Sequence, residues 1–175
     1  PEPLADFIDL FMLGEGEEVI LALANLYRRA KQEGWGKVQF LKAANDLEGV
    51  YVPSLYDVAY HEDGTVKEIL PVDSAKYPVK KRIVQNLSEM YYPKDFIVPY
   101  IDTVHDRAII ELMRGCIRGC RFCQAGFLYR PLREKDADVL CSQGMSLCET
   151  TGYEELSLSS LSTSDYSGLE PMLDT

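Results

Sequence analysis

Three cysteines lie close together in the sequence: Cys116, Cys120 and Cys123. Their spacing is C-x3-C-x2-C, and an aromatic residue, Phe122, stands directly before the last of them. Three thiolates at this density can bind three irons of a cubane iron–sulfur cluster, which leaves the fourth iron without a protein ligand. An open iron can bind and reduce a substrate, whereas a fully ligated cluster only transfers electrons. The spacing therefore predicts a four-iron cluster that does chemistry of its own.

A zinc site and plain burial stay open as alternatives for Cys116, Cys120 and Cys123. A structural zinc site would take a fourth ligand from Cys141, Cys148 or a histidine, although zinc usually draws two pairs of ligands from separate turns. Ordinary buried thiols are the second alternative, but three of them in an arginine-rich loop would be reactive. Cys141 and Cys148 share one face of a predicted helix, so we expect them to pack in a core.

The two histidines are expected to be structural. His61 falls at the tip of a predicted hairpin, where it would be solvated. His105 precedes the strand that leads to the cysteines, so it would lie at the opposite end of that strand from them. Neither position favours a histidine ligand for cobalt or zinc.

The composition is that of a globular protein. The chain has 175 residues, 46% of them hydrophobic, and no apolar run approaches the roughly 20 residues of a membrane span. Five cysteines, an odd number, and the lack of a signal peptide argue against a disulfide framework and favour a reducing cytoplasm. The first residue is Pro1 rather than Met, so we expect a fragment of a longer protein.

Charge is distributed unevenly along the chain. The net charge is −10, which excludes a general attraction to nucleic acid or to anionic lipid. Between Arg114 and Arg133, however, there are five arginines and no acidic residue. These arginines indicate either a solubilising surface loop or a site where anionic thiolates and a ligand carboxylate need to be neutralised.

The first half of the chain is predicted to contain a strand–turn–helix unit and a β-hairpin. Residues 6–13 are predicted to form a buried strand, and residues 19–31 show helical spacing with acidic residues ahead of them and basic residues at their end. The turn between them suits either a cofactor tail or a tight connection. The remaining expected elements are a helix over 38–47, an extended segment over 50–52, hairpin strands over 55–60 and 66–70, and a linker over 71–103 with a short helix near 83–90.

The second half is predicted to form one βαβ unit. A strand over 108–113 leads directly into the cysteines, a helix covers 136–150, and a second strand covers 156–161. The cysteines then follow the C-terminal end of a parallel strand. In β/α barrels that end carries the active site, so the placement agrees with the chemistry.

The segment from Glu111 to Gly126, ELMRGCIRGCRFCQAG, resembles the cluster-binding segment of a cobalamin-binding family of radical S-adenosylmethionine (SAM) enzymes. Members of that family carry a cobalamin-binding domain ahead of a β/α barrel. Residues 11–18 (FMLGEGEE) are similar to the last strand and helix of that domain, and residues 49–54 and 97–99 are similar to its connecting region. The resemblance touches most of the chain, and its specific part is the cysteine segment.

The resemblance implies roles for the residues of these motifs. Phe122 would lie against the adenine of SAM, and the SAM amino group would be received after the second barrel strand. Family members often have a glycine-rich acidic stretch there, whereas this chain has three hydroxyl residues followed by Asp165. The alternative for this serine-rich segment is a plain strand end with turn residues. The implied [4Fe–4S] ligands are Cys116, Cys120 and Cys123; the implied SAM hydroxyls are Ser162, Thr163 and Ser164; the implied cobalamin residues are Gly14, Glu15 and Gly16.

The implied reaction is reductive cleavage of SAM at the cluster, giving methionine and a 5′-deoxyadenosyl radical that removes a hydrogen atom from a substrate. If cobalamin is present in the full protein, a methyl transfer or a rearrangement would follow, on a substrate that the sequence does not identify. The alternative, from a different class, is an electron-transfer or regulatory iron–sulfur module without SAM chemistry. The expected partners are therefore small-molecule cofactors.

We expect an α/β fold in three parts. Residues 1–36 would form the last unit of a doubly wound cobalamin-binding-type domain, residues 37–106 a connecting region with a β-hairpin, and residues 107–175 the start of a TIM-like radical SAM barrel. Neither domain would be complete, so this fragment alone is expected to be inactive.

Overall fold

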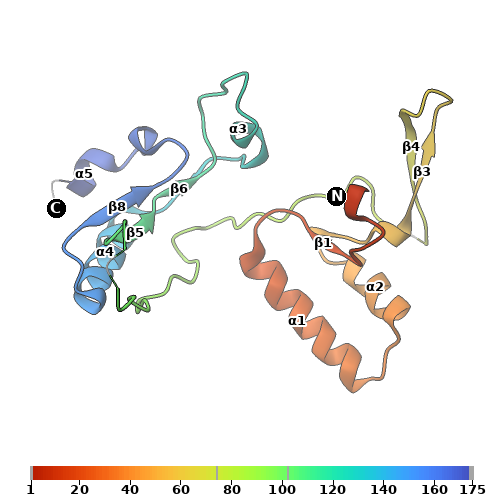
Figure 1. Cartoon of the computed structure of the whole chain (residues 1–175), viewed down its shortest axis with the longest axis horizontal. Helices are drawn as coiled ribbons and strands as arrows, with labels where there is room; N and C mark the ends of the chain where they lie inside the picture. The colour runs from red at the N-terminus through yellow and green to blue at the C-terminus, as the bar shows by residue number, and fades with distance from the viewer. Residues whose placement is uncertain (1, 74, 102, 174–175) are drawn as a thin grey trace. The chain divides into compact units, whose positions relative to one another are not determined.

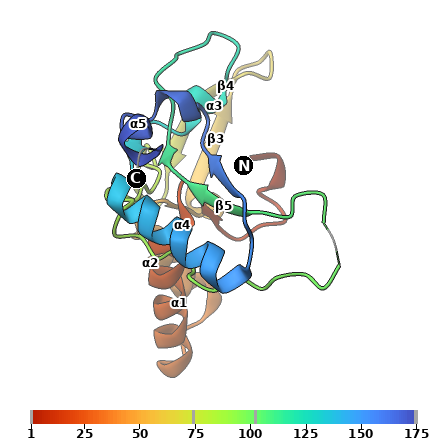
Figure 2. The same cartoon turned by 90° about the vertical axis from the view of Figure 1, so that its left-hand side faces the viewer.

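The computed structural model describes residues 2–73, 75–101 and 103–173. The chain divides into two compact units, Pro1–Val84 and Gln85–Thr175, each with its own hydrophobic core (Figures 1 and 2). The domain boundaries expected after residues 36 and 106 stay predictions. Among the described residues, no helix has the length and apolarity that a membrane crossing requires.

The first unit combines helices with short paired strands (Figure 1). Its elements are the 3-10 helix η1 (Glu2–Leu4), strand β1 (Phe11–Met12), helices α1 (Gly16–Gln32) and α2 (Lys37–Asn45), strand β2 (Val50–Tyr51), the 3-10 helix η2 (Pro53–Leu55), and strands β3 (Tyr56–Tyr60) and β4 (Val66–Pro71). The predicted helices over 19–31 and 38–47 are confirmed. In α1, Glu17 and Glu18 occupy the first turn and Arg29 and Lys31 the last, where each charge complements the helix dipole.

The core of the first unit is built by α1, α2 and β2. Val19, Leu41 and Val50, one from each element, are buried in it. β1 pairs with β2 in antiparallel register, with Phe11 opposite Tyr51. The doubly wound arrangement expected here, with parallel strands, is therefore not confirmed.

The strand predicted over residues 6–13 is wrong over most of its length. Only Phe11–Met12 is extended in a strand, and Phe7 is 83% exposed. The backbone N–H groups of Phe7 and Ile8 instead donate to the carbonyl oxygen of Leu4 at 3.0 and 3.1 Å. A short apolar run carries no periodicity that separates a strand from other structures, so the sequence could not settle this segment.

The hairpin is confirmed, and β3 and β4 pair antiparallel from Tyr56 opposite Pro71 onward. At its turn Gly64 has a φ of +82°, and both the N–H and the hydroxyl of Thr65 donate to the Asp63 carboxylate, at 2.9 and 2.7 Å. These bonds give the local turn chemistry that Asp-Gly predicts. His61 lies at this turn and is exposed, as expected.

The short helix predicted near residues 83–90 is wrong. Residues 83–90 contain no helix or strand, and Leu87 is buried among them. The N–H of Ser88 donates to the side chain of Asn86 at 3.0 Å, and the Ser88 hydroxyl accepts the N–H of Asp136 at 2.9 Å. Such side-chain bonds to the backbone compete with helical hydrogen bonds, which explains the failure of the prediction.

The second unit contains the predicted βαβ arrangement. Its elements are strands β5 (Ala108–Glu111) and β6 (Met113–Arg114), helix α3 (Ala125–Leu128), strand β7 (Arg133–Glu134), helix α4 (Ala137–Thr151), strand β8 (Leu156–Ser159), the 3-10 helix η3 (Thr163–Asp165) and helix α5 (Leu169–Leu173). β5 and β8 pair in parallel, from Ala108 opposite Leu156 to Glu111 opposite Ser159. α4 lies alongside β5 (Figure 2) and ends at Gly152, whose φ is +75°.

The strand predicted over residues 108–113 is divided at Leu112. β5 pairs in parallel with β8, whereas β6 pairs antiparallel with β7, with Met113 opposite Glu134 and Arg114 opposite Arg133. One continuous segment therefore contributes to two different two-stranded sheets. The change of partner cannot be read from the segment itself, because it depends on residues beyond the cysteines.

Cys141 and Cys148 are half-buried on α4 and do not belong to its fully buried set, which is Leu140, Gly144 and Leu147. The expectation that they pack in a core is met only in part. As a whole the chain is a mixed α/β protein with small sheets, which agrees with the predicted class. The finer description, a cobalamin domain and a partial barrel, is not confirmed.

Candidate iron–sulfur and SAM site

The predicted cluster ligands lie on a loop that β6 and β7 close at its base. We call residues 115–132 the cysteine loop. At its start Gly115 has a φ of +91°, and a Cβ there would lie 2.7 Å from the carbonyl oxygen of Pro131. Glycine is therefore required where the two ends of the loop come together, because a side chain would collide with backbone atoms.

All three cysteines of the loop are free thiols. Cys116 and Cys123 are half-buried, and Cys120 is exposed. The N–H of Arg118 points to the Sγ of Cys116 at 3.5 Å, and the N–H of Cys123 donates to the carbonyl oxygen of Cys120 at 3.0 Å. None of the three thiols is fully buried, so each can be reached by a metal ion or cluster.

These thiols fit a three-thiolate cluster by their number and chemistry. Within residues 2–73, 75–101 and 103–173, no three His, Cys, Asp or Glu side chains are close enough to hold a metal ion. No closed four-ligand zinc site is therefore formed by the described residues, and the three sulfurs would have to converge when a cluster binds. Metal ligation commonly completes the folding of a loop in this way.

Phe122 is 92% exposed, and its neighbours in the loop, Ile117 and Phe127, are exposed as well. An aromatic ring that contacts so little of the protein leaves both of its faces open to a planar ligand. This exposure is compatible with the adenine contact implied for Phe122, which stays a prediction.

The second predicted group, Ser162, Thr163 and Ser164, follows β8 and forms a compact hydrogen-bonded turn. The hydroxyls of Ser160 and Thr163 lie 3.0 Å apart, and the N–H of Ser162 donates to the Ser160 hydroxyl at 3.3 Å. The Ser162 hydroxyl donates to the carboxylate of Asp165. Hydrogen bonds of this kind are ordinary in a serine-rich turn, so they do not distinguish a SAM site from a plain strand end with turn residues.

An ion pair joins this turn to the cysteine loop. The Nε of Arg118 donates to Oδ2 of Asp165 at 2.6 Å, and Nη2 of Arg118 contacts Oδ1 of the same carboxylate. The Arg118 guanidinium, followed by the Ser162 hydroxyl, holds the pKa of Asp165 below its ordinary value. Two groups that the sequence predicts separately are therefore brought into contact.

A second set of contacts fastens the same turn to the base of the loop. The hydroxyl of Tyr166 donates to the carbonyl oxygen of Lys135 at 2.8 Å, and the N–H of Ser167 donates to Glu134 at 3.1 Å. The N–H of Lys135 in turn donates to Leu112, between β5 and β6, at 2.9 Å. The cysteine loop, the end of β8 and the start of α4 are thus tied together.

Lys135 is a feature that the sequence did not reveal. Its side chain is 2% exposed, its Nζ has no hydrogen-bond partner among the described residues, and it lies 4.6 Å from the ring centre of Tyr92. Burial lowers the pKa of its ammonium group, while the Glu111 carboxylate acts in the opposite direction. Glu111 is bound by Arg114 at 2.9 and 3.0 Å, so it gives Lys135 no direct partner.

Of the residues expected near cobalamin, Gly14 and Glu15 contact Arg82 of the first unit, whereas a Cβ on Gly16 would meet nothing within 4 Å. Gly14 forms a β-bridge with Arg82, and a Cβ on Gly14 would lie 2.0 Å from the carbonyl oxygen of Arg82. The N–H of Glu15 donates to that oxygen at 2.9 Å. Close packing accounts for the glycine at position 14, and the cobalamin role stays a prediction.

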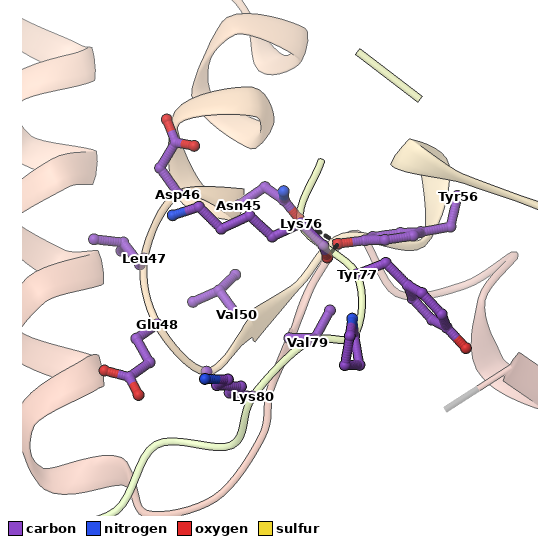
Figure 3. Close-up of a pocket in the computed structure, with 12 residues that line it drawn as sticks. Asn45, Asp46, Leu47, Glu48, Val50, Tyr56, Lys76, Tyr77, Val79 and Lys80 are labelled. Atoms are coloured by element: carbon purple, nitrogen blue, oxygen red, sulfur yellow. Dashed lines mark hydrogen bonds between the residues drawn. The ribbon is translucent and has the colours of Figure 1, made fainter. Parts of the chain in front are cut away.

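The first unit also has a cavity of about 440 Å³ between the end of α2, β2 and residues 76–80 (Figure 3). Tyr56 crosses its edge and donates from its hydroxyl to the carbonyl oxygen of Lys76 at 2.8 Å. None of the residues predicted for cluster, SAM or cobalamin binding lines this cavity.

The family model that matches this chain covers residues ahead of the three cysteines. Residues 1–53 match the family described as "Radical SAM proteins, N-terminal". An uncharacterized protein of Methanocaldococcus jannaschii is 29% identical over 168 residues, which cover 94% of this chain and 29% of the relative, so the chain spans less than a third of the length of that protein. No solved structure matches. The family match supports membership of the radical SAM superfamily, and the cobalamin-binding subfamily is not confirmed.

Proposed function

We propose that this chain is part of a radical SAM enzyme, and that Cys116, Cys120 and Cys123 bind its [4Fe–4S] cluster. The observation that carries the proposal is the contact between the cysteine loop and the turn after β8, through Arg118 and Asp165. The family match supports it independently, because residues 1–53 contain none of the three cysteines.

A [4Fe–4S] cluster held by Cys116, Cys120 and Cys123 would supply the electron for the reductive cleavage of SAM. The chain's own residues bind and orient the SAM molecule. The exposed ring of Phe122 stacks against the adenine, and the hydroxyls of Ser162, Thr163 and Ser164 accept hydrogen bonds from the SAM ammonium group. The loop arginines offset the negative charge of the thiolates and of the SAM carboxylate.

For the whole protein, the proposal includes cobalamin. The resemblance of residues 11–18 to the end of a cobalamin domain supports a cobalamin-dependent methyl transfer or rearrangement, and Gly14, Glu15 and Gly16 would lie near that cofactor. The free thiols fit a reducing, cytoplasmic compartment.

The test is anaerobic reconstitution of the intact protein with iron and sulfide, followed by reduction with dithionite in the presence of SAM. We expect 5′-deoxyadenosine to form, and to disappear in C116A, C120A and C123A. C141A and C148A are matched controls, because these half-buried thiols lie on α4 and should leave the product unchanged. A full iron–sulfur cluster that gives no 5′-deoxyadenosine would instead favour an electron-transfer or regulatory module.

A further inference from the structure

We propose that Arg118 and Asp165 are a positioning pair, which sets the distance between the cysteine loop and the turn after β8. This inference rests on the proposed function, because it concerns how the cluster and SAM are held together. The pair spans 47 residues of sequence and joins two groups for which the sequence predicts different ligands. Both nitrogens of the guanidinium edge contact both oxygens of the carboxylate, which fixes orientation as well as distance.

The two partners differ in their exposure to water. The Asp165 side chain is 9% exposed, whereas that of Arg118 is 59% exposed. A carboxylate that is largely removed from water depends on its protein partners for stabilisation. Asp165 therefore acts as the fixed member of the pair, and Arg118 brings the loop to it.

The pair is connected to the ligand groups on both sides. On the loop side, Arg118 donates from its backbone N–H to the Sγ of Cys116, at 3.5 Å. On the other side, Asp165 accepts the hydroxyl of Ser162, whose N–H is held by Ser160. A shift of the ion pair would consequently move a predicted cluster ligand relative to a predicted SAM ligand.

The turn has other attachments that do not involve Arg118. Tyr166 and Ser167 hold it to Lys135 and Glu134 at the base of the loop. Removal of the ion pair should therefore loosen the loop while the fold of the second unit persists. A change in the mobility of the loop in a single variant can therefore be assigned to the loss of the ion pair.

The experiment compares D165N, R118Q and the double variant with the wild type in the intact protein. R121Q is the matched control for the exchange readout alone, because Arg121 is an exposed arginine of the same loop. The first readout is amide hydrogen exchange of residues 115–132 in the protein without a cluster. We expect faster exchange in D165N and R118Q but not in R121Q, with β5 and α4 unchanged.

The second readout is the SAM concentration that gives half-maximal 5′-deoxyadenosine formation at equal iron content. We expect about a tenfold increase in D165N and R118Q, and no further increase in the double variant, because the two residues act as one unit. Wild-type exchange in D165N, or an unchanged SAM requirement, would overturn the proposal. If the wild type binds a cluster but forms no 5′-deoxyadenosine, the proposed function fails, and the exchange experiment still decides whether the pair holds the loop.

Discussion

The hydroxyl of Tyr166 donates a 2.8 Å hydrogen bond to the carbonyl oxygen of Lys135, where β7 gives way to α4. Both residues are buried, so water cannot replace the bond. The substitution Y166F leaves the Lys135 carbonyl without this donor and should lower the free energy of unfolding by about 1.5 kcal/mol.

The measurement for Y166F is urea-induced unfolding, with Y129F as the control. Tyr129 is 53% exposed on the cysteine loop, so the loss of its hydroxyl should change stability by less than about 0.5 kcal/mol. Equal stabilities of Y166F and the wild type would contradict the role of this bond.

Lys135 should make stability depend on pH in the alkaline range. Its pKa is lowered in the folded protein, chiefly by burial, so between that lowered value and the ordinary pKa of about 10.4 the unfolded chain binds more protons than the folded one. Stability should therefore rise with pH across this window, as the penalty for a buried charge disappears. The groups that influence Lys135 are Glu111, which raises its pKa, and Arg114, which lowers it.

The substitution K135M should remove this pH dependence. At pH 7 we expect K135M to be as stable as the wild type or more stable by about 1 kcal/mol, because the gain from removing an unpaired buried charge exceeds the loss of the contact with Tyr92. K94M, at an exposed lysine, is the control and should behave as the wild type. Denaturant unfolding from pH 7 to pH 10 measures both variants, and a K135M curve parallel to the wild type would refute the role given to Lys135.

Gly115 and Gly152 provide a matched pair of glycines with positive φ. Ala at position 152 would meet no atom of the described residues within 4 Å, so G152A should cost only about 1 kcal/mol of left-handed backbone strain. Ala at position 115 would also collide with Pro131 and Leu132, so G115A should cost about 3 kcal/mol or more and displace the ends of the cysteine loop.

Thermal unfolding distinguishes these two variants, and iron content after reconstitution shows whether the loop has changed. We expect G115A to bind less iron than G152A, because only Gly115 lies in the cysteine loop. Similar stability and iron content in the two variants would argue against the close contact between Gly115 and residues 131–132.

Local patterns in the sequence were sufficient for several elements. The helical spacing of residues 19–31 predicted α1, the hairpin strands over 55–60 and 66–70 predicted β3 and β4, and the helix over 136–150 predicted α4. Each of these signals lies within a few residues of the structure that it determines. The spacing of the three cysteines is also local, and it places them in one short segment.

Features that depend on distant residues were not predictable. The division of the strand at Leu112 follows from pairing with β7, which lies beyond the cysteines. The burial of Lys135 depends on Tyr92, and nothing in the surrounding charged run distinguishes this lysine. Arg118 and Asp165 carry opposite charges, but the chain has many other charged residues, and only the fold determines that these two form a pair.

The central claim is that three thiolates hold a four-iron cluster and leave one iron open to SAM. Mössbauer spectroscopy of the intact protein, reconstituted anaerobically with ⁵⁷Fe and titrated with SAM, tests it most directly. We predict that about one quarter of the cluster iron changes its spectrum when SAM is added, because a single iron of the cubane lacks a protein ligand. A cluster whose irons all keep their spectrum, or a protein that binds zinc and no sulfide-bridged iron, would contradict it.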